Sequence, residues 1–227
     1  MNADVERDGF AIIPGVIGEE ERGELIALLG DVSGAGRRGL LALPGVAALA
    51  RSSRLSGLVQ SCFAFEGIEA SKPVPVRAIY FDKSPSPNWL VPWHQDLTLA
   101  LRERVEMPGF GPWSVKEGIL DVQPPVELMG RMLAVRLHLD DTDGSNGALR
   151  VLPGSHRMGR LSGKRIQELR AGQEECVCVA SAGDALLMRP LLLHASGRST
   201  SGRHRRVLHI EYAAFALPAG LEWCEAA

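Results

Sequence analysis

The stretch VPWHQDL, residues 91–97, places a histidine and an aspartate two positions apart. Side chains two apart on a β-strand point to the same face, so His94 and Asp96 could offer one nitrogen and one carboxylate oxygen to a common point. With one further histidine, such a pair completes the 2-His-1-carboxylate facial triad, which holds Fe(II) by one face and leaves other positions open. An isolated H-x-D pair is also common on protein surfaces, so the motif acquires meaning only with its third member.

The segment LLLHASGR, residues 191–198, supplies a candidate for that third member. His194 ends its apolar run, and eleven residues later Arg205 begins a predicted strand with His209 and Glu211 on the same face. An arginine can bind a carboxylate through two parallel hydrogen bonds, which lysine cannot reproduce. An H-x-D pair, a distant histidine and an arginine beyond it form the pattern of iron enzymes that use 2-oxoglutarate.

The elements that must position these residues are mostly short strands. Apolar or alternating segments are separated by Gly, Pro, Asn and Asp, a pattern typical of β-structure. Two helices are predicted in the N-terminal part, at 19–30, with acidic residues in its first turn and Gly30 at its end, and at 45–62. The predicted strands are 9–17, broken at Pro14–Gly15, and 74–83, 131–140, 147–157, 174–190 and 206–217.

Two of the predicted strands have one apolar face and one ionisable face. Leu133, Val135 and Leu137 alternate with Arg136 and His138. A simple sandwich would turn the ionisable face to water. The predicted N-terminal helices can instead cover the apolar face from outside, so that the ionisable face lines a cavity.

The strand beginning at Arg205 has the same two faces. Leu208, Ile210 and Tyr212 share the parity of Arg206, so we expect Arg205 and not Arg206 to face the cavity. The chain is therefore expected to be mainly β with flanking helices, a double-stranded β-helix (jelly-roll, cupin-like) with the N-terminal helices packed on one sheet. We expect one domain over residues 1–227.

Composition excludes several partners. The 227 residues carry a formal net charge of -2 with a pI near 6.3, which gives no basic surface for nucleic acid or an anionic membrane. The four cysteines show no metal-ligand spacing, and reduced thiols are expected. The first residues are acidic and lack an apolar signal region, and no apolar stretch approaches the length of a membrane span. A soluble, cytoplasmic protein is the expectation.

Four segments together resemble the phytanoyl-CoA dioxygenase family, over nearly the whole chain. They are DGFAIIPGV at 8–16, PWHQDL at 92–97, NGALRVLPGSHR at 146–157 and LLHASGRSTSGRHRRVLHIEYA at 192–213. The resemblance implies that His94, Asp96 and His194 ligate iron and form the catalytic centre. It further implies that Arg205 holds the distal carboxylate of 2-oxoglutarate, and that Fe(II), 2-oxoglutarate and O2 are the cofactor and cosubstrates.

Other site residues follow from the same resemblance. Arg136 lies at a strand position from which family members contact the cosubstrate, and Ser196 matches a small polar position beside the distal histidine. In RAIYFDK the resemblance turns the face with Arg77, Ile79, Phe81 and Lys83 into the cavity. The residues expected to contact substrate are Arg77, Gln95 and Trp113. The segment 98–130 has several Pro and Gly breakers, and we expect a mobile lid that packs few side chains against the barrel.

The resemblance favours hydroxylation of a C–H bond of a small-molecule metabolite, with release of succinate and CO2. Asp96 supports this choice, because related halogenases lack the carboxylate and bind chloride in its place. Desaturation or epoxidation on the same iron centre remains open, and so does a non-catalytic barrel that binds a small ligand.

Overall fold

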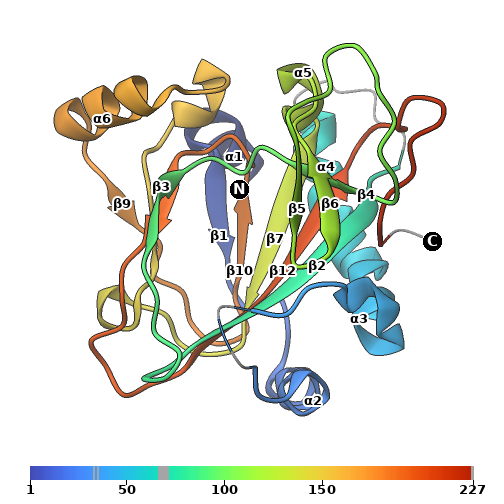
Figure 1. Cartoon of the computed structure of the whole chain (residues 1–227). Coiled ribbons are helices and arrows are strands. Elements are labelled where there is room, and N and C mark those ends of the chain that lie inside the picture. The colour runs from blue at the N-terminus through green and yellow to red at the C-terminus, as the bar shows by residue number, and fades with distance from the viewer. Residues whose placement is uncertain (33, 35, 66–71, 226–227) are drawn as a thin grey trace.

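The computed structural model describes all residues except 33, 35, 66–71 and 226–227. Its strands form two main antiparallel sheets that lie opposite each other (Figure 1), with side chains of both sheets packed together in one apolar cluster. The architecture is a double-stranded β-helix, as predicted. In order, the larger sheet holds β1 (Phe10–Ile13), β10 (Ala185–Met188), β7 (Met132–His138), β12 (Arg205–Ala213) and β2 (Val74–Lys83), and the smaller holds β3 (Val91–His94), β11 (His194–Ser196), β8 (Leu149–Val151) and β9 (Cys176–Val177).

Helices cover the outer face of the larger sheet. The predicted apolar faces of β7 and β12 are fully buried, with Leu133, Leu137 and Leu208 each at 0% exposure in one cluster with residues of the helices. Tyr212 adds a hydrogen bond from its hydroxyl to the carbonyl oxygen of Ala50 (2.7 Å). The opposite faces of the same strands are therefore free to line an interior cavity. The helices on this face are α1 (Asn2–Asp8), α2 (Glu19–Leu29), α3 (Pro44–Ala50) and α4 (Ser53–Phe65), whereas α5 (Val126–Met129) and α6 (Gly163–Gly172) pack in other apolar clusters.

The helix boundaries partly differ from those predicted. Helix α2 ends as expected at Gly30, whose φ of 60° favours glycine. The single helix predicted over 45–62 is wrong, because the chain breaks between α3 and α4. The hydroxyl of Ser52 accepts a hydrogen bond from the backbone N–H of Leu55 (3.3 Å), and so caps a new helix. In the described part of the chain, no helix is both long and apolar enough to cross a membrane.

The segment predicted as one strand over 174–190 is instead two strands in different sheets. β9 pairs with β8 in the smaller sheet, whereas β10 pairs with β1 and β7 in the larger one. The turn between them contains Gly183 at φ 96°, where a Cβ atom would lie 2.6 Å from the carbonyl oxygen of Ile17. Glycine is required there, and the turn carries the chain from one sheet to the other.

The segment 98–130 forms a small sheet of its own, in the order β4 (Leu99–Leu101), β6 (Ile119–Val122) and β5 (Trp113–Lys116), followed by α5. The expectation that it packs few side chains is wrong. Leu99, Leu101 and Val122 are buried in a cluster with Val76 of β2 and Met132 of β7. This insert sheet therefore forms one end of the barrel.

Candidate metal centre

His94, Asp96 and His194 converge between the two main sheets. His94 at the end of β3 pairs directly with His194 at the start of β11. Their Nε2 atoms lie 3.5 and 3.7 Å from the two carboxylate oxygens of Asp96. The three residues offer ligand atoms that all lie within 4.8 Å of one another, and the described residues contain no second such group of three. The sequence motif and the distal histidine thus meet at one point.

Both imidazole rings are oriented by the backbone. Nδ1 of His94 lies 2.8 Å from the carbonyl oxygen of Pro92, and Nδ1 of His194 lies 2.8 Å from that of Leu192. A carbonyl accepts, so each Nδ1 carries the hydrogen and each Nε2 presents its lone pair toward Asp96. Metal-ligating histidines are held by such a hydrogen bond from the second ring nitrogen.

The ionisation of His194 and Asp96 also suits a metal, whereas for His94 the effect of burial, which would lower its pKa, is outweighed by Asp96, which raises it. Burial lowers the pKa of His194 to about 4, even though Asp96 opposes the shift. Burial works against the charge of Asp96, but His194 and His94 outweigh it and hold the pKa of that carboxyl well below its usual range. At neutral pH the site offers a neutral imidazole and a carboxylate. These are the forms that bind metal, and this donor set is that of non-haem Fe(II) sites.

The three residues line a cavity of about 420 Å³. The ionisable face of β12, with Arg205, His209 and Glu211, lines the same cavity. Arg205 is 3% exposed in its wall, and its Nε has no hydrogen-bond partner among the described residues. Arg206 points the other way and makes a two-fold ion pair with Asp140 (2.6 and 2.8 Å). The alternation along β12 therefore assigns the two neighbouring arginines correctly.

One end of this cavity is rich in unneutralised positive charge. Burial, followed by the repulsion of Arg136, lowers the pKa of Arg205 to about 9. Arg136 is 7% exposed and donates to Nδ1 of His209 (3.1 Å), while its Nε lacks a partner. Within the described chain, no carboxylate lies within ion-pair distance of either guanidinium. We call this the cation end, and its donors fit a carboxylate ligand such as that of 2-oxoglutarate.

The opposite end is also charged, but its charges are paired. Arg77 lies 3.3 Å from a carboxylate oxygen of Asp121 and 3.9 Å from one of Glu211. Thr98 donates to Asp121 (3.1 Å), and His209 reaches Glu211 at 3.4 Å. We call this the balanced end. It lies farther along β2 and β12 from Arg205, where Arg77 and Glu211 are register partners.

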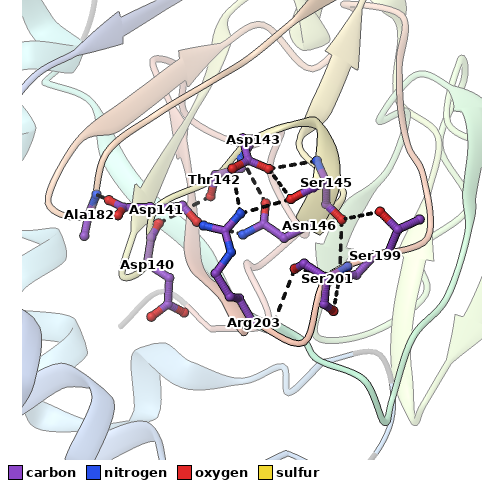
Figure 2. Close-up of polar contacts among 11 residues, drawn as sticks. Asp140, Asp141, Thr142, Asp143, Ser145, Asn146, Ala182, Ser199, Ser201 and Arg203 are labelled. Carbon is purple, nitrogen blue, oxygen red and sulfur yellow. Dashed lines mark hydrogen bonds and ion pairs between the residues drawn. The ribbon is translucent and has the colours of Figure 1, made fainter.

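The connection between β11 and β12 is anchored so that Ser196 and Arg205 keep their places. Figure 2 shows Arg203 directed at Asp143 and Ser145, with distances of 2.6 and 3.0 Å. The backbone N–H of Thr200 donates to the carbonyl of Ser145 (2.7 Å). Asp143 also accepts from the backbone N–H of Ser145. The turn after β7 thus fixes the chain that leads into the cation end.

Two of the residues expected to contact substrate, Gln95 and Trp113, make other contacts within the protein. Gln95 borders the cavity, but its amide nitrogen donates to the carbonyls of Gly159 and Leu191 and its oxygen accepts from the N–H of Leu161. Its polar atoms thus hold backbone segments together. Trp113 is not among the residues that line this cavity and packs against the apolar cluster of the insert sheet. Arg77 does line the cavity, as expected.

Sequence reasoning missed the contribution of the insert sheet. Asp121 is fully buried beside Arg77, and Lys116 and Gln123 line the cavity. The lone aspartate in the apolar run ILDV was the available signal, because a carboxylate at a buried position must have a partner. The partner could not be found, since Arg77 is distant in sequence.

Several solved structures share this fold. AviO1 from Streptomyces viridochromogenes Tue57 is 23% identical with a TM-score of 0.66, covering 96% of this chain and 95% of its own. The epimerase SnoN from nogalamycin biosynthesis, solved with Fe3+, alpha ketoglutarate and nogalamycin RO, is 15% identical with a TM-score of 0.71, covering 93% and 81%. EctD from S. alaskensis with bound Fe is 18% identical with a TM-score of 0.69, covering 99% and 82%.

Sequence comparison assigns the family. No curated protein sequence matches the chain significantly. The family model described as phytanoyl-CoA dioxygenase (PhyH) matches residues 37–207, a range that contains His94, Asp96, His194 and Arg205. The chain therefore belongs to the phytanoyl-CoA dioxygenase family, and it is a 2-oxoglutarate-dependent non-haem iron enzyme.

Proposed function

We propose that this enzyme hydroxylates an unactivated C–H bond of a small-molecule metabolite while 2-oxoglutarate is converted to succinate and CO2. The observation that carries the proposal is the convergence of His94, Asp96 and His194 beside a buried arginine that has no carboxylate within ion-pair distance among the described residues. A metal-ligand set and a carboxylate-binding group within one cavity are the two requirements of this chemistry.

Each residue has a defined part in this proposal. Nε2 of His94, Nε2 of His194 and a carboxylate oxygen of Asp96 hold the iron. Arg205 binds the distal carboxylate of 2-oxoglutarate by charge-assisted hydrogen bonds. Arg136 extends the positive potential toward the metal. Bound iron supplies the activation of O2, and the protein supplies position and electrostatics.

Asp96 favours oxygen transfer over halogenation. The two histidines hold the pKa of Asp96 well below its usual range, so this carboxyl is anionic. As an iron ligand, it would occupy the position that a halide takes in halogenases. The position of Arg205 matters for rate as well as affinity, since misplacing reacting atoms by about 1 Å can cost on the order of a hundredfold.

The outcome of the reaction depends on where the substrate is held. Two neighbours of this fold are described as an epimerase, SnoN, and a carbocyclase, SnoK, both alpha ketoglutarate dependent. Desaturation and epoxidation are further outcomes on the same centre. A non-catalytic ligand-binding barrel is disfavoured, because His94, Asp96, His194 and Arg205 are all present.

The test is a screen of candidate metabolites for stimulated formation of succinate, with Fe(II), 2-oxoglutarate and O2 present. A substrate should raise succinate formation and gain one oxygen atom, detected by mass spectrometry. A product that has lost two hydrogen atoms would indicate desaturation instead of hydroxylation, and a product that is an isomer of the substrate would indicate epimerisation. The variant Asp96→Ala is the control for succinate formed without this site.

A further inference from the structure

Lys83 places a fully buried ammonium group at the cation end. It is the last residue of β2 and the register partner of Arg205, with 0% of its surface exposed. Its Nζ donates to the hydroxyl of Ser196 (2.7 Å) and to the carbonyl oxygen of Gly197 (2.5 Å). Among the described residues it has no carboxylate within ion-pair distance. An unneutralised buried ammonium is costly, so its retention calls for a ligand-related explanation.

The side chain of Lys83 fits because a glycine lies next to its ammonium group. Gly147 adopts φ +78°, and a Cβ atom there would lie 3.1 Å from Nζ of Lys83 and 2.7 Å from the carbonyl oxygen of Gly197. The ring of Trp89 lies 5.2 Å from Nζ. Ser196 in turn donates to the carbonyl of Gly147 (2.8 Å). Lys83 and Gly147 therefore fix the hydroxyl of Ser196 at the cavity wall.

The charged groups that act on Lys83 are all cations. Burial, then Arg205 on β12, Arg136 on β7 and Arg198 after β11, lower its pKa to about 7. His138 on β7 is buried, with its pKa lowered to about 3 by burial and the same two cavity arginines. Asp82, the neighbour of Lys83 on β2, is bound to His204 (2.8 Å). Among the described residues, no carboxylate is in a position to offset the charge of Lys83.

We propose that Lys83 is a positioning residue for the distal carboxylate of 2-oxoglutarate: by donating to the Ser196 oxygen it holds that hydroxyl at the cavity wall, where the hydroxyl hydrogen can turn from the Gly147 carbonyl to the ligand carboxylate, and it adds a further positive charge to those of Arg205 and Arg136. This inference rests on the proposed function, because it assumes that the cosubstrate carboxylate enters the cation end. Lys83 binds the hydroxyl and leaves Arg205 to make the direct contact.

A dependence on pH follows. The bound carboxylate favours the charged form of Lys83, so binding of 2-oxoglutarate takes up a proton wherever free Lys83 is partly neutral. The affinity should be greatest below about pH 7, where Lys83 is already protonated, and fall as the pH rises above that value. Ordinary lysines, which titrate near 10.4, would give no such change between pH 7 and 8.5.

The experiment is anaerobic calorimetric titration of the Fe(II)-loaded enzyme with 2-oxoglutarate at pH 6.5, 7.5 and 8.5. The variants are Lys83→Met, Ser196→Ala, their double mutant, Arg205→Leu, and Lys164→Met as a matched control on the exposed face of α6. Lys83→Met should weaken binding at pH 6.5 by about tenfold and flatten the pH profile. The double mutant should lose less than the two single losses combined, because both act through one hydrogen bond.

The possible results distinguish a failure of the role of Lys83 from a failure of the proposed 2-oxoglutarate site. Unchanged affinity and an unchanged pH profile in Lys83→Met, with weakened binding in Arg205→Leu, would overturn the role of Lys83 alone. Unchanged affinity in Arg205→Leu would overturn the proposed carboxylate site itself. If Lys83→Met does not fold, the wild-type enzyme still decides: titration in buffers of different ionisation enthalpy must reveal proton uptake at pH 7.5, and its absence would refute the proposal.

Discussion

Both ends of the cavity carry charged side chains, but only at the balanced end do cations and carboxylates pair with each other. At the balanced end, Arg77 already has Asp121 and Glu211 within 3.3 and 3.9 Å. At the cation end, Arg205 has no carboxylate partner within the described chain, although it is even more deeply buried, at 3% exposure against 7% for Arg77. Paired buried charges offset one another, whereas an unpaired buried charge is costly unless a ligand supplies its partner. The comparison therefore separates a structural charge network from a binding site.

The largest effect is expected at the balanced end. Arg77→Leu leaves two carboxylates without their cation, and should lower the free energy of unfolding by about 3–5 kcal/mol, while the affinity for 2-oxoglutarate changes little. Urea denaturation and ligand titration measure the two quantities. The double variant Arg77→Leu/Asp121→Leu should recover part of the stability. A loss of 2-oxoglutarate binding without a loss of stability would reverse the roles of the two ends.

At the cation end the pattern should be opposite. Arg205→Leu should weaken 2-oxoglutarate binding by about a hundredfold, since hydrogen bonds to charged groups contribute about 1.5–3 kcal/mol. The affinity for Fe(II) should be unchanged, and the unfolding free energy unchanged or raised. Arg206→Leu is the matched control, because its guanidinium is bound to Asp140 outside the cavity. An equal loss of binding in that control would mean that the register of β12 is displaced by one residue.

The insert sheet should behave as a wall of the balanced end. Trp113→Ala removes a half-buried side chain that packs against the apolar cluster, and should lower the unfolding free energy by about 2 kcal/mol. Hydrogen exchange in the free protein should find the amides of β4 and β6 protected. Fast exchange throughout 98–130, with stability unaffected by the substitution, would instead support a mobile lid.

Near neutral pH the smallest effect is that of His138, which lies near the cation end, and this effect grows only as the pH falls. Burial, Arg136 and Arg205 lower its pKa to about 3, below the unfolded value near 6.5, so the unfolded chain binds more protons between these values. Stability should therefore fall as the pH decreases from 6.5 toward 3, by at most about 1.4 kcal/mol per pH unit from this group. Denaturation at several pH values should give a shallower dependence in His138→Leu. A steeper dependence in that variant would contradict the assignment.

The sequence predicted what depends on local alternation. The parity of Leu208, Ile210 and Tyr212 correctly turned Arg205 inward and Arg206 outward, because a strand has only two faces. The spacing of His94 and Asp96 also placed two ligands together, although β3 ends at His94 and Asp96 follows just outside the strand. Both predictions needed only residues close in the chain.

Features that depend on distant pairing were missed. Every residue of β4 is buried, so it shows no alternation, and its pairing partner β6 comes only after β5 in the sequence. The break between α3 and α4 rests on one serine cap within a run that otherwise suits a continuous helix. The engagement of Gln95 depends on backbone groups at Gly159 and Leu191, which no local pattern in VPWHQDL encodes.

The central claim is that His94, Asp96 and His194 hold an iron ion that chelates 2-oxoglutarate beside the cation end. Anaerobic titration with Fe(II) and 2-oxoglutarate, followed by visible absorption, tests it most directly, because a weak metal-to-ligand charge-transfer band forms only in the chelate. The account predicts a saturable band at one iron per chain that is lost in Asp96→Ala and kept in Arg206→Leu. No band in the wild-type protein, or an undiminished band in Asp96→Ala, would contradict it.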